Sequence, residues 1–146
     1  MGEIEREVRI EASPETVYSL LTDAGEITKW MGVEAELDPR PGGVYRLRVN
    51  PQALALGEFV ELDPLKRVVY TFGWDGHPTV GAGSTTVELT LMQDGSGTVL
   101  KLVHRDLPGD EVEQHTQGWE HFLSRLEVVG AGGDPGPDPM ASAGGG

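Results

Sequence analysis

Apolar and polar side chains alternate along residues 3–11. The odd positions carry glutamate or arginine, whereas Ile4, Val8 and Ile10 occupy even positions. Successive side chains of a β-strand point to opposite faces, so this pattern predicts a strand with one buried and one exposed face. Arg6 interrupts the apolar register, and its head group either reaches solvent from the end of the strand or faces a ligand.

A helix is predicted from Ser13, because serine caps a helix N-terminus and Pro14 and Glu15 suit the first turn. An apolar stripe at helical spacing continues to Met31, but an Asp-Ala-Gly sequence at residues 23–25 interrupts it. The pattern therefore predicts two short helices, with Trp30 closing the second.

The middle of the chain reads as short strands separated by turns rich in glycine, proline and aspartate. In one of these strands Val68, Tyr70, Phe72 and Trp74 fall on the same face and form an aromatic row. Strands that follow each other through tight turns are typical of an antiparallel meander. The strands are predicted at residues 33–37, 44–49, 57–62, 67–74, 85–93 and 98–105.

The most regular pattern lies close to the end of the chain and predicts a long helix with one broad apolar face. Asp110 is predicted to cap this helix and Gly130 to end it. Such a helix needs a curved sheet to pack against, so we expect an α+β fold with a cavity between the sheet and the helix. The apolar face consists of Val112, His115, Thr116, Trp119, Phe122, Leu123 and Leu126.

Charge and composition exclude several classes of function. The formal net charge of −13 argues against nucleic acid and anionic membranes as partners, because both are bound through lysine and arginine. The chain has no cysteine and no apolar run near the roughly 20 residues of a membrane-spanning helix, which favours a cytoplasmic protein. We expect one domain over residues 1–130. The glycine- and proline-rich residues 131–146 offer little to bury and are predicted to be a disordered tail.

Six segments, in this order, resemble the START-like superfamily, and in particular its branch related to the activator of the heat-shock chaperone ATPase. The resemblance implies a helix-grip fold, in which a curved antiparallel sheet wraps around a long C-terminal helix and two short helices follow the first strand. Members of the superfamily include ligand carriers, polyketide cyclases and chaperone partners. The segments that carry the resemblance are residues 11–23, 27–32, 41–47, 57–64, 68–74 and 118–126.

Several side chains are candidates to line a ligand cavity, where apolar walls provide affinity and a few polar groups fix orientation. His104 shares an inward strand face with leucines and is either a satisfied core histidine or a ligand contact. Trp119 is likewise either core packing or a ligand contact. No metal site is expected, because the four histidines are scattered, and no cofactor motif is found. The candidate ligand-binding residues are Arg6, Trp30, Tyr70, Phe72, Trp74, His104, His115 and Trp119.

The leading hypothesis is a non-enzymatic domain that binds an apolar or aromatic small molecule. One alternative is a protein-interaction module of the chaperone-regulator type, which would use the acidic outer face. The other is a cyclase or aromatase, with a cavity histidine such as His104 acting as general acid or base.

Overall fold

The structure is a computed structural model that describes residues 2–139 of the chain. Seven antiparallel strands form one sheet in the order β1-β7-β6-β5-β4-β3-β2. The strands are β1 (Gly2–Ile10), β2 (Glu34–Leu37), β3 (Val44–Asn50), β4 (Ala53–Asp63), β5 (Arg67–Phe72), β6 (Thr85–Asp94) and β7 (Gly97–Leu107). The helices are α1 (Pro14–Thr22), α2 (Ala24–Ile27) and α3 (Val112–Gly130), and a short 3-10 turn, η1 (Gly109–Glu111), precedes α3.

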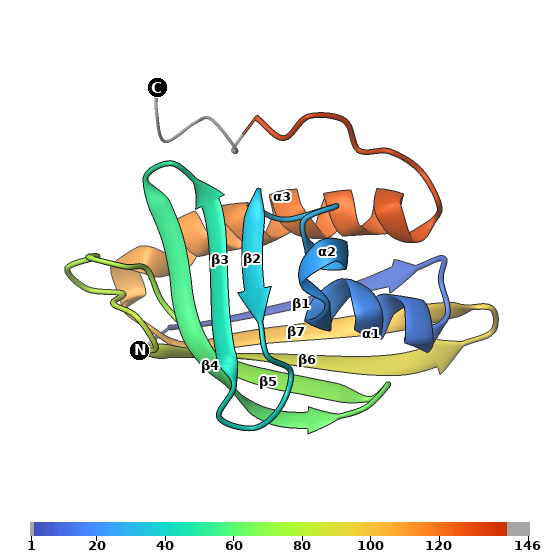
Figure 1. Cartoon of the computed structure of the whole chain (residues 1–146), viewed down its shortest axis with the longest axis horizontal. Helices are drawn as coiled ribbons and strands as arrows, with labels where there is room; N and C mark the ends of the chain where they lie inside the picture. The colour runs from blue at the N-terminus through green and yellow to red at the C-terminus, as the bar shows by residue number, and fades with distance from the viewer. Residues whose placement is uncertain (1, 140–146) are drawn as a thin grey trace.

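The sheet is a meander whose first strand returns to pair with the last. Strands β2 to β7 follow each other in sequence order, and β1 adds to the free edge of β7. Figure 1 shows β2, β3 and β4 standing at a steep angle to β1, β7 and β6, so the sheet is strongly curved, with α3 lying against one face. The predicted α+β helix-grip fold is confirmed.

The core fills the space between the curved sheet and the helices. Alternate residues of β5 (Val68, Tyr70 and Phe72) are buried on the inner face, as the strand pattern predicts. Next to them the rings of Tyr45 and Tyr70 stack with centroids 4.1 Å apart. Phe72, in the same aromatic row, packs against Trp119 in the first half of α3, with ring centroids 6.4 Å apart.

The two short helices form as their capping residues predict. Ser13 Oγ accepts a hydrogen bond from the Thr16 amide at 3.3 Å, and Pro14 is the first residue of α1. Asp23 ends α1 and caps α2, because its carboxylate accepts from the Gly25 amide at 2.8 Å. The aspartate that interrupts the apolar stripe is therefore what separates the two helices.

Several boundaries differ from those predicted: for example, α2 ends at Ile27 rather than near Trp30, and β5 ends at Phe72 rather than at Trp74. β4 starts at Ala53 rather than at residue 57, because β3 and β4 form a hairpin that pairs Asn50 with Ala53. The prediction that Asp110 caps α3 is wrong: this residue lies inside η1, where the Glu111 amide donates to the Pro108 carbonyl. The N-cap is Glu111, which makes no side-chain capping bond.

Residues 131–139 leave α3 and run back along it (Figure 1). Asp138 Oδ1 lies 2.7 Å from His121 Nε2, and its other oxygen lies 3.8 Å from Arg125 Nε. Asp138 therefore meets two basic side chains of the helix, while the disorder predicted for residues 131–146 stays a prediction. Residues 140–146 of that prediction lie outside the described residues. No helix within residues 2–139 is long and apolar enough to cross a membrane.

Candidate functional site

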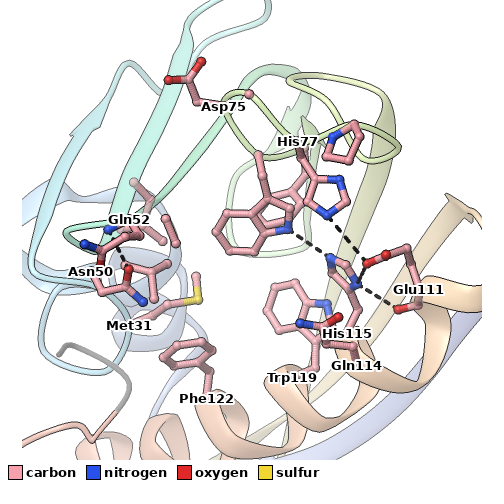
Figure 2. A pocket seen from close by; sticks show the side chains of 18 residues that line it. Met31, Asn50, Gln52, Asp75, His77, Glu111, Gln114, His115, Trp119 and Phe122 are labelled. Carbon is pink, nitrogen blue, oxygen red and sulfur yellow. Dashed lines mark hydrogen bonds and ion pairs between the residues drawn. The ribbon is translucent and has the colours of Figure 1, made fainter. Parts of the chain in front are cut away.

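A cavity of about 510 Å³ lies between the sheet and the first half of α3. Figure 2 shows the side chains that surround it, with Asn50 and Gln52 on one side and His77, His115 and Glu111 on the other. β3 and the start of β4 form one wall, α3 a second, and the loop between β5 and β6 a third. The lining residues are Met31, Leu47, Val49, Asn50, Gln52, Ala53, Phe72, Trp74, Asp75, Gly76, His77, Pro78, Glu111, Gln114, His115, Gly118, Trp119 and Phe122.

Helical spacing brings one face of α3 onto the cavity. His115, Trp119 and Phe122 recur at intervals of four and three residues and point the same way. Gly118 lies between them, and a Cβ placed on it would meet no atom within 4 Å. The cavity is therefore open above Gly118, so this glycine adds to its volume.

The loop over residues 73–84 forms one wall of the cavity and is held by its own hydrogen bonds. The Trp74 amide donates to the Val80 carbonyl at 2.8 Å, and Val80 is fully buried. At its neck, Gly73 passes so close to the backbone that a Cβ would lie 1.7 Å from the Gly81 carbonyl oxygen. The loop therefore places Trp74 and His77 at the cavity through backbone contacts that tolerate no larger residue at position 73.

Hydrogen bonds determine which nitrogen of His115 carries its proton. The Trp74 indole N–H can only donate, so His115 Nε2, 3.0 Å away, is the acceptor. The proton of the neutral ring is then on Nδ1, which donates to the Glu111 backbone carbonyl at 2.8 Å. Both nitrogens of His115 are therefore occupied, and they connect the loop to the start of α3.

Hydrogen bonds also fix the ring of His77, but they place its proton on the other nitrogen. Its Nδ1 accepts hydrogen bonds from the amides of Thr79 and Val80, at 3.1 and 2.8 Å. The proton of the neutral ring is therefore on Nε2, and this N–H faces Glu111 Oε1 at 3.9 Å. That distance is too long for a hydrogen bond.

The carboxylate of Glu111 lies between these two imidazoles (Figure 2). Its Oε1 lies 3.6 Å from His115 Nδ1 and 3.9 Å from His77 Nε2, and it has no hydrogen-bond partner among the described residues. The side chain is only 16% exposed. A buried carboxylate oxygen without a donor is costly, and such groups mark places where a ligand can supply one.

His104 lies outside this cavity, directly behind Trp119. Its Nδ1 accepts from the Trp119 indole N–H at 3.0 Å, and its Nε2 therefore donates to Thr85 Oγ1 at 2.8 Å. The Thr85 hydroxyl in turn donates to the Phe72 carbonyl at 2.7 Å. Burial, and to a smaller extent the neighbouring His115, lowers the pKa of His104 to about 3. The ring is a neutral and fully hydrogen-bonded part of the core.

The structure brings together four of the eight residues predicted to bind a ligand. The four that line the cavity are Phe72, Trp74, His115 and Trp119. Tyr70 and His104 are buried in the core beside it. Trp30 ties α1 to α3, because its indole donates to the Leu20 carbonyl and its own carbonyl accepts from Arg125. Arg6 lies 3.7 Å from Glu120 on the outer side of α3 and is 40% exposed.

The prediction did not include the polar residues of the cavity, namely Asn50, Gln52, Asp75, His77, Glu111 and Gln114. Gln52, Asp75 and His77 lie in turns or loops, where no periodicity marks the direction of a side chain. One local signal existed, since Glu111 and His115 are four residues apart, the spacing that places two residues on one helix face. Within residues 2–139 no three histidine or acidic side chains group closely enough to hold a metal ion.

Residues 11–131 match the model of the Activator of Hsp90 ATPase homolog 1-like protein family. The chain belongs to this family. An AHSA1-like protein from Rhizobium etli, known from a solution structure, is 46% identical, with a TM-score of 0.76, over 94% of this chain and 87% of that one. The resemblance predicted from the sequence is confirmed.

Two further relatives carry the name of a chaperone activator. An HSP90 activator from Plasmodium falciparum is 26% identical over 87% of this chain and 94% of that one, with a TM-score of 0.73. The human Activator of 90 kDa heat shock protein ATPase homolog 1 is 26% identical over 110 residues, which are 75% of this chain and 31% of the human protein. The match thus spans about a third of the length of the human protein.

Proposed function

We propose that this AHSA1-like chain binds a small apolar or aromatic molecule in the cavity between the sheet and α3. The main support for this proposal is the cavity itself. Its volume of about 510 Å³ falls within the range of ordinary ligand sites, roughly 300 to 1,000 Å³. Phe72, Trp74, Trp119 and Phe122 offer aromatic surface to a ligand, and most polar side chains lie on two opposite sides of the cavity, with Asp75 at its rim.

The proposed function is binding without catalysis. His104, the histidine that a cyclase reading of the sequence would use as acid or base, has both nitrogens engaged within the core. His115, which does reach the cavity, has both nitrogens engaged as well. A general acid or base must reach the proton that it transfers, and neither His104 nor His115 offers a free nitrogen, which argues against the cyclase mechanism that uses His104.

The proposal is tested by filling the cavity from Gly118. Gly118→Leu projects a side chain into the open space, while Gln117→Leu adds the same residue at the neighbouring exposed position. N-phenyl-1-naphthylamine, a neutral aromatic probe, reports binding by its fluorescence. We expect the wild type and Gln117→Leu to bind the probe and Gly118→Leu to lose it, with all three folded by circular dichroism. Unchanged binding in Gly118→Leu, or no binding to the wild type, would refute the proposal.

A second candidate function, regulation of a 90 kDa heat-shock chaperone, is supported by the names of two relatives. The outer face of β1 adds a physical reason, because Glu3, Glu5 and Glu7 are exposed side by side on a chain of net charge −13. Such a strip of like charge attracts a basic surface and is screened by salt.

The hypothesis of chaperone regulation is tested by measuring the ATPase rate of the chaperone from the same host with and without this protein. We expect a change in rate at low salt that disappears when the three glutamates are replaced by lysine. A rate that is the same with and without the protein would count against this function and leave ligand binding untouched.

A further inference from the structure

The charges around the cavity are of one sign. Asp75 and Glu111 both line it, whereas none of the eleven lysines and arginines does. Arg48, which lies between the lining residues Leu47 and Val49 in β3, points to the opposite face and donates to the carbonyls of residues 50 and 51. A cleft with low-dielectric walls and charges of one sign concentrates ligands of the opposite sign.

Glu111 supplies an acceptor for such a ligand. Its Oε1 has no hydrogen-bond donor among the described residues, and the N–H groups of His77 and His115 are 3.9 and 3.6 Å away. The terminal torsion of a glutamate rotates easily, so either oxygen can turn toward a ligand in the cavity. A charged donor there would satisfy the carboxylate with a hydrogen bond stronger than one between neutral groups.

The aromatic walls favour the same sign of charge. Trp74, Trp119, Phe72 and Phe122 line the space beside Glu111. The face of an aromatic ring carries partial negative charge and attracts a cation placed over it, most strongly in tryptophan and where water is excluded. Acidic groups and aromatic faces around one space, with no lysine or arginine, therefore select against anions and for cations.

We infer that the ligand of this cavity is an apolar or aromatic molecule carrying a protonated amine, with the amine held at Glu111 and the body among the aromatic side chains. The inference rests on the proposed ligand-binding function and specifies its chemistry. It also accounts for the position of Glu111, whose Oε1 is buried at the cavity with no donor among the described residues.

Three probes with one ring system separate charge from shape: 2-naphthylmethylamine, 2-naphthylmethanol and 2-naphthoate. Affinities are measured by quenching of tryptophan fluorescence at pH 7.5, where the amine is protonated. We expect the amine to bind about tenfold more tightly than the alcohol, as a charge-assisted hydrogen bond provides, and the carboxylate to bind most weakly.

Two variants of α3 and its cap locate the effect. Glu111→Gln should bring the affinity of the amine down to that of the alcohol. Glu113→Gln removes the same charge from an exposed position outside the cavity and should leave the order of the three probes unchanged. Asp75→Asn, at the rim, provides an independent test that does not alter the start of α3. We expect it to lower the affinity of the amine as well, but by less than Glu111→Gln does.

The outcomes distinguish this inference from the proposed function. If the alcohol or the carboxylate binds the wild type as tightly as the amine, the inference is wrong and the cavity is a neutral binding site. If Glu111→Gln and Glu113→Gln weaken the amine equally, the effect belongs to net charge rather than to the site, and the inference is also wrong. If none of the three probes binds, the proposed ligand-binding function fails with it.

Discussion

Stability should fall on mild acidification because His104 is buried as a neutral ring. The side chain has no exposed surface, and burial lowers its pKa to about 3 from the ordinary value of 6.5. Protonation would place a hydrogen on Nδ1, where the Trp119 indole N–H already donates, so two donors would face each other. The folded state therefore excludes a proton that the unfolded chain binds.

The magnitude follows from the two pKa values. Between pH 6.5 and pH 3 the unfolded state binds more protons at this residue than the folded state does, so stability rises with pH across that window. The contribution of His104 to the free energy of unfolding is fully present above the unfolded-state pKa of 6.5 and is lost progressively as the pH falls below it. Between about pH 7.5 and about pH 5.0 the linkage from this one histidine amounts to about 2 kcal/mol of unfolding free energy.

The assay is urea unfolding, followed by tryptophan fluorescence at these two pH values, for the wild type and for His104→Gln. Glutamine keeps one donor and one acceptor but does not titrate. The wild type should lose about 2 kcal/mol more than the variant on acidification, whatever the variant costs at neutral pH. Stopping at about pH 5.0 keeps most carboxylates charged, and the other three histidines are common to both proteins.

Equal losses in the two proteins would refute the reasoning. Nitrogen NMR of the imidazoles gives a direct second reading, in which one histidine of the folded wild type stays neutral at about pH 5.0 with its proton on Nε2. A protonated His104 in the folded state would show that the hydrogen bonds to Trp119 and Thr85 do not hold the ring neutral.

Three further measurements probe other parts of the structure. Gly57→Ala would bring a Cβ within 1.8 Å of the Thr71 carbonyl, so we expect a loss of about 1 to 3 kcal/mol in thermal unfolding; an unchanged melting temperature would contradict that close approach. Burial raises the pKa of Tyr45 to about 12, so its contribution to stability should be complete below pH 10 and fall above it, with the tyrosinate absorbance of this residue appearing only as the protein unfolds. Asp138→Asn should cost up to about 1 kcal/mol by weakening the contact with His121, and no change would show that this contact adds nothing to stability.

The secondary structure was predictable because the patterns that specify it are local. Ser13 and Asp23 start the two short helices through side-chain bonds to amides two or three residues away. The alternation that places Val68, Tyr70 and Phe72 on one face of β5 is a property of a few successive residues, and all three are buried in the structure. The start of α3 was misplaced because it does not depend on a local pattern alone. Asp110 and Glu111 are both acidic, and the 3-10 turn after β7 decides which of them is the cap.

The candidate site was predictable only in part, because alternation assigns a face and not a position along it. Tyr70, Phe72 and Trp74 share one face of the sheet, yet Tyr70 is enclosed by the core and the other two reach the cavity. That division depends on where α3 crosses the curved sheet, which no local pattern records. Glu111 and His77 meet across 34 residues of sequence, through a loop whose conformation is set by backbone contacts.

The sequence by itself determined the order of strands and helices, the apolar face of the last helix, the acidic character and the family. These are properties of periodicity, capping, composition and motif, and each is written in a short stretch of chain. Only the tertiary structure decided that His104 is a core residue and His115 a cavity residue, although both lie on inward faces. The physical reason is packing. Curvature of the sheet closes the space behind Trp119 and leaves it open beside Gly118, so two histidines with similar sequence patterns lie in different surroundings.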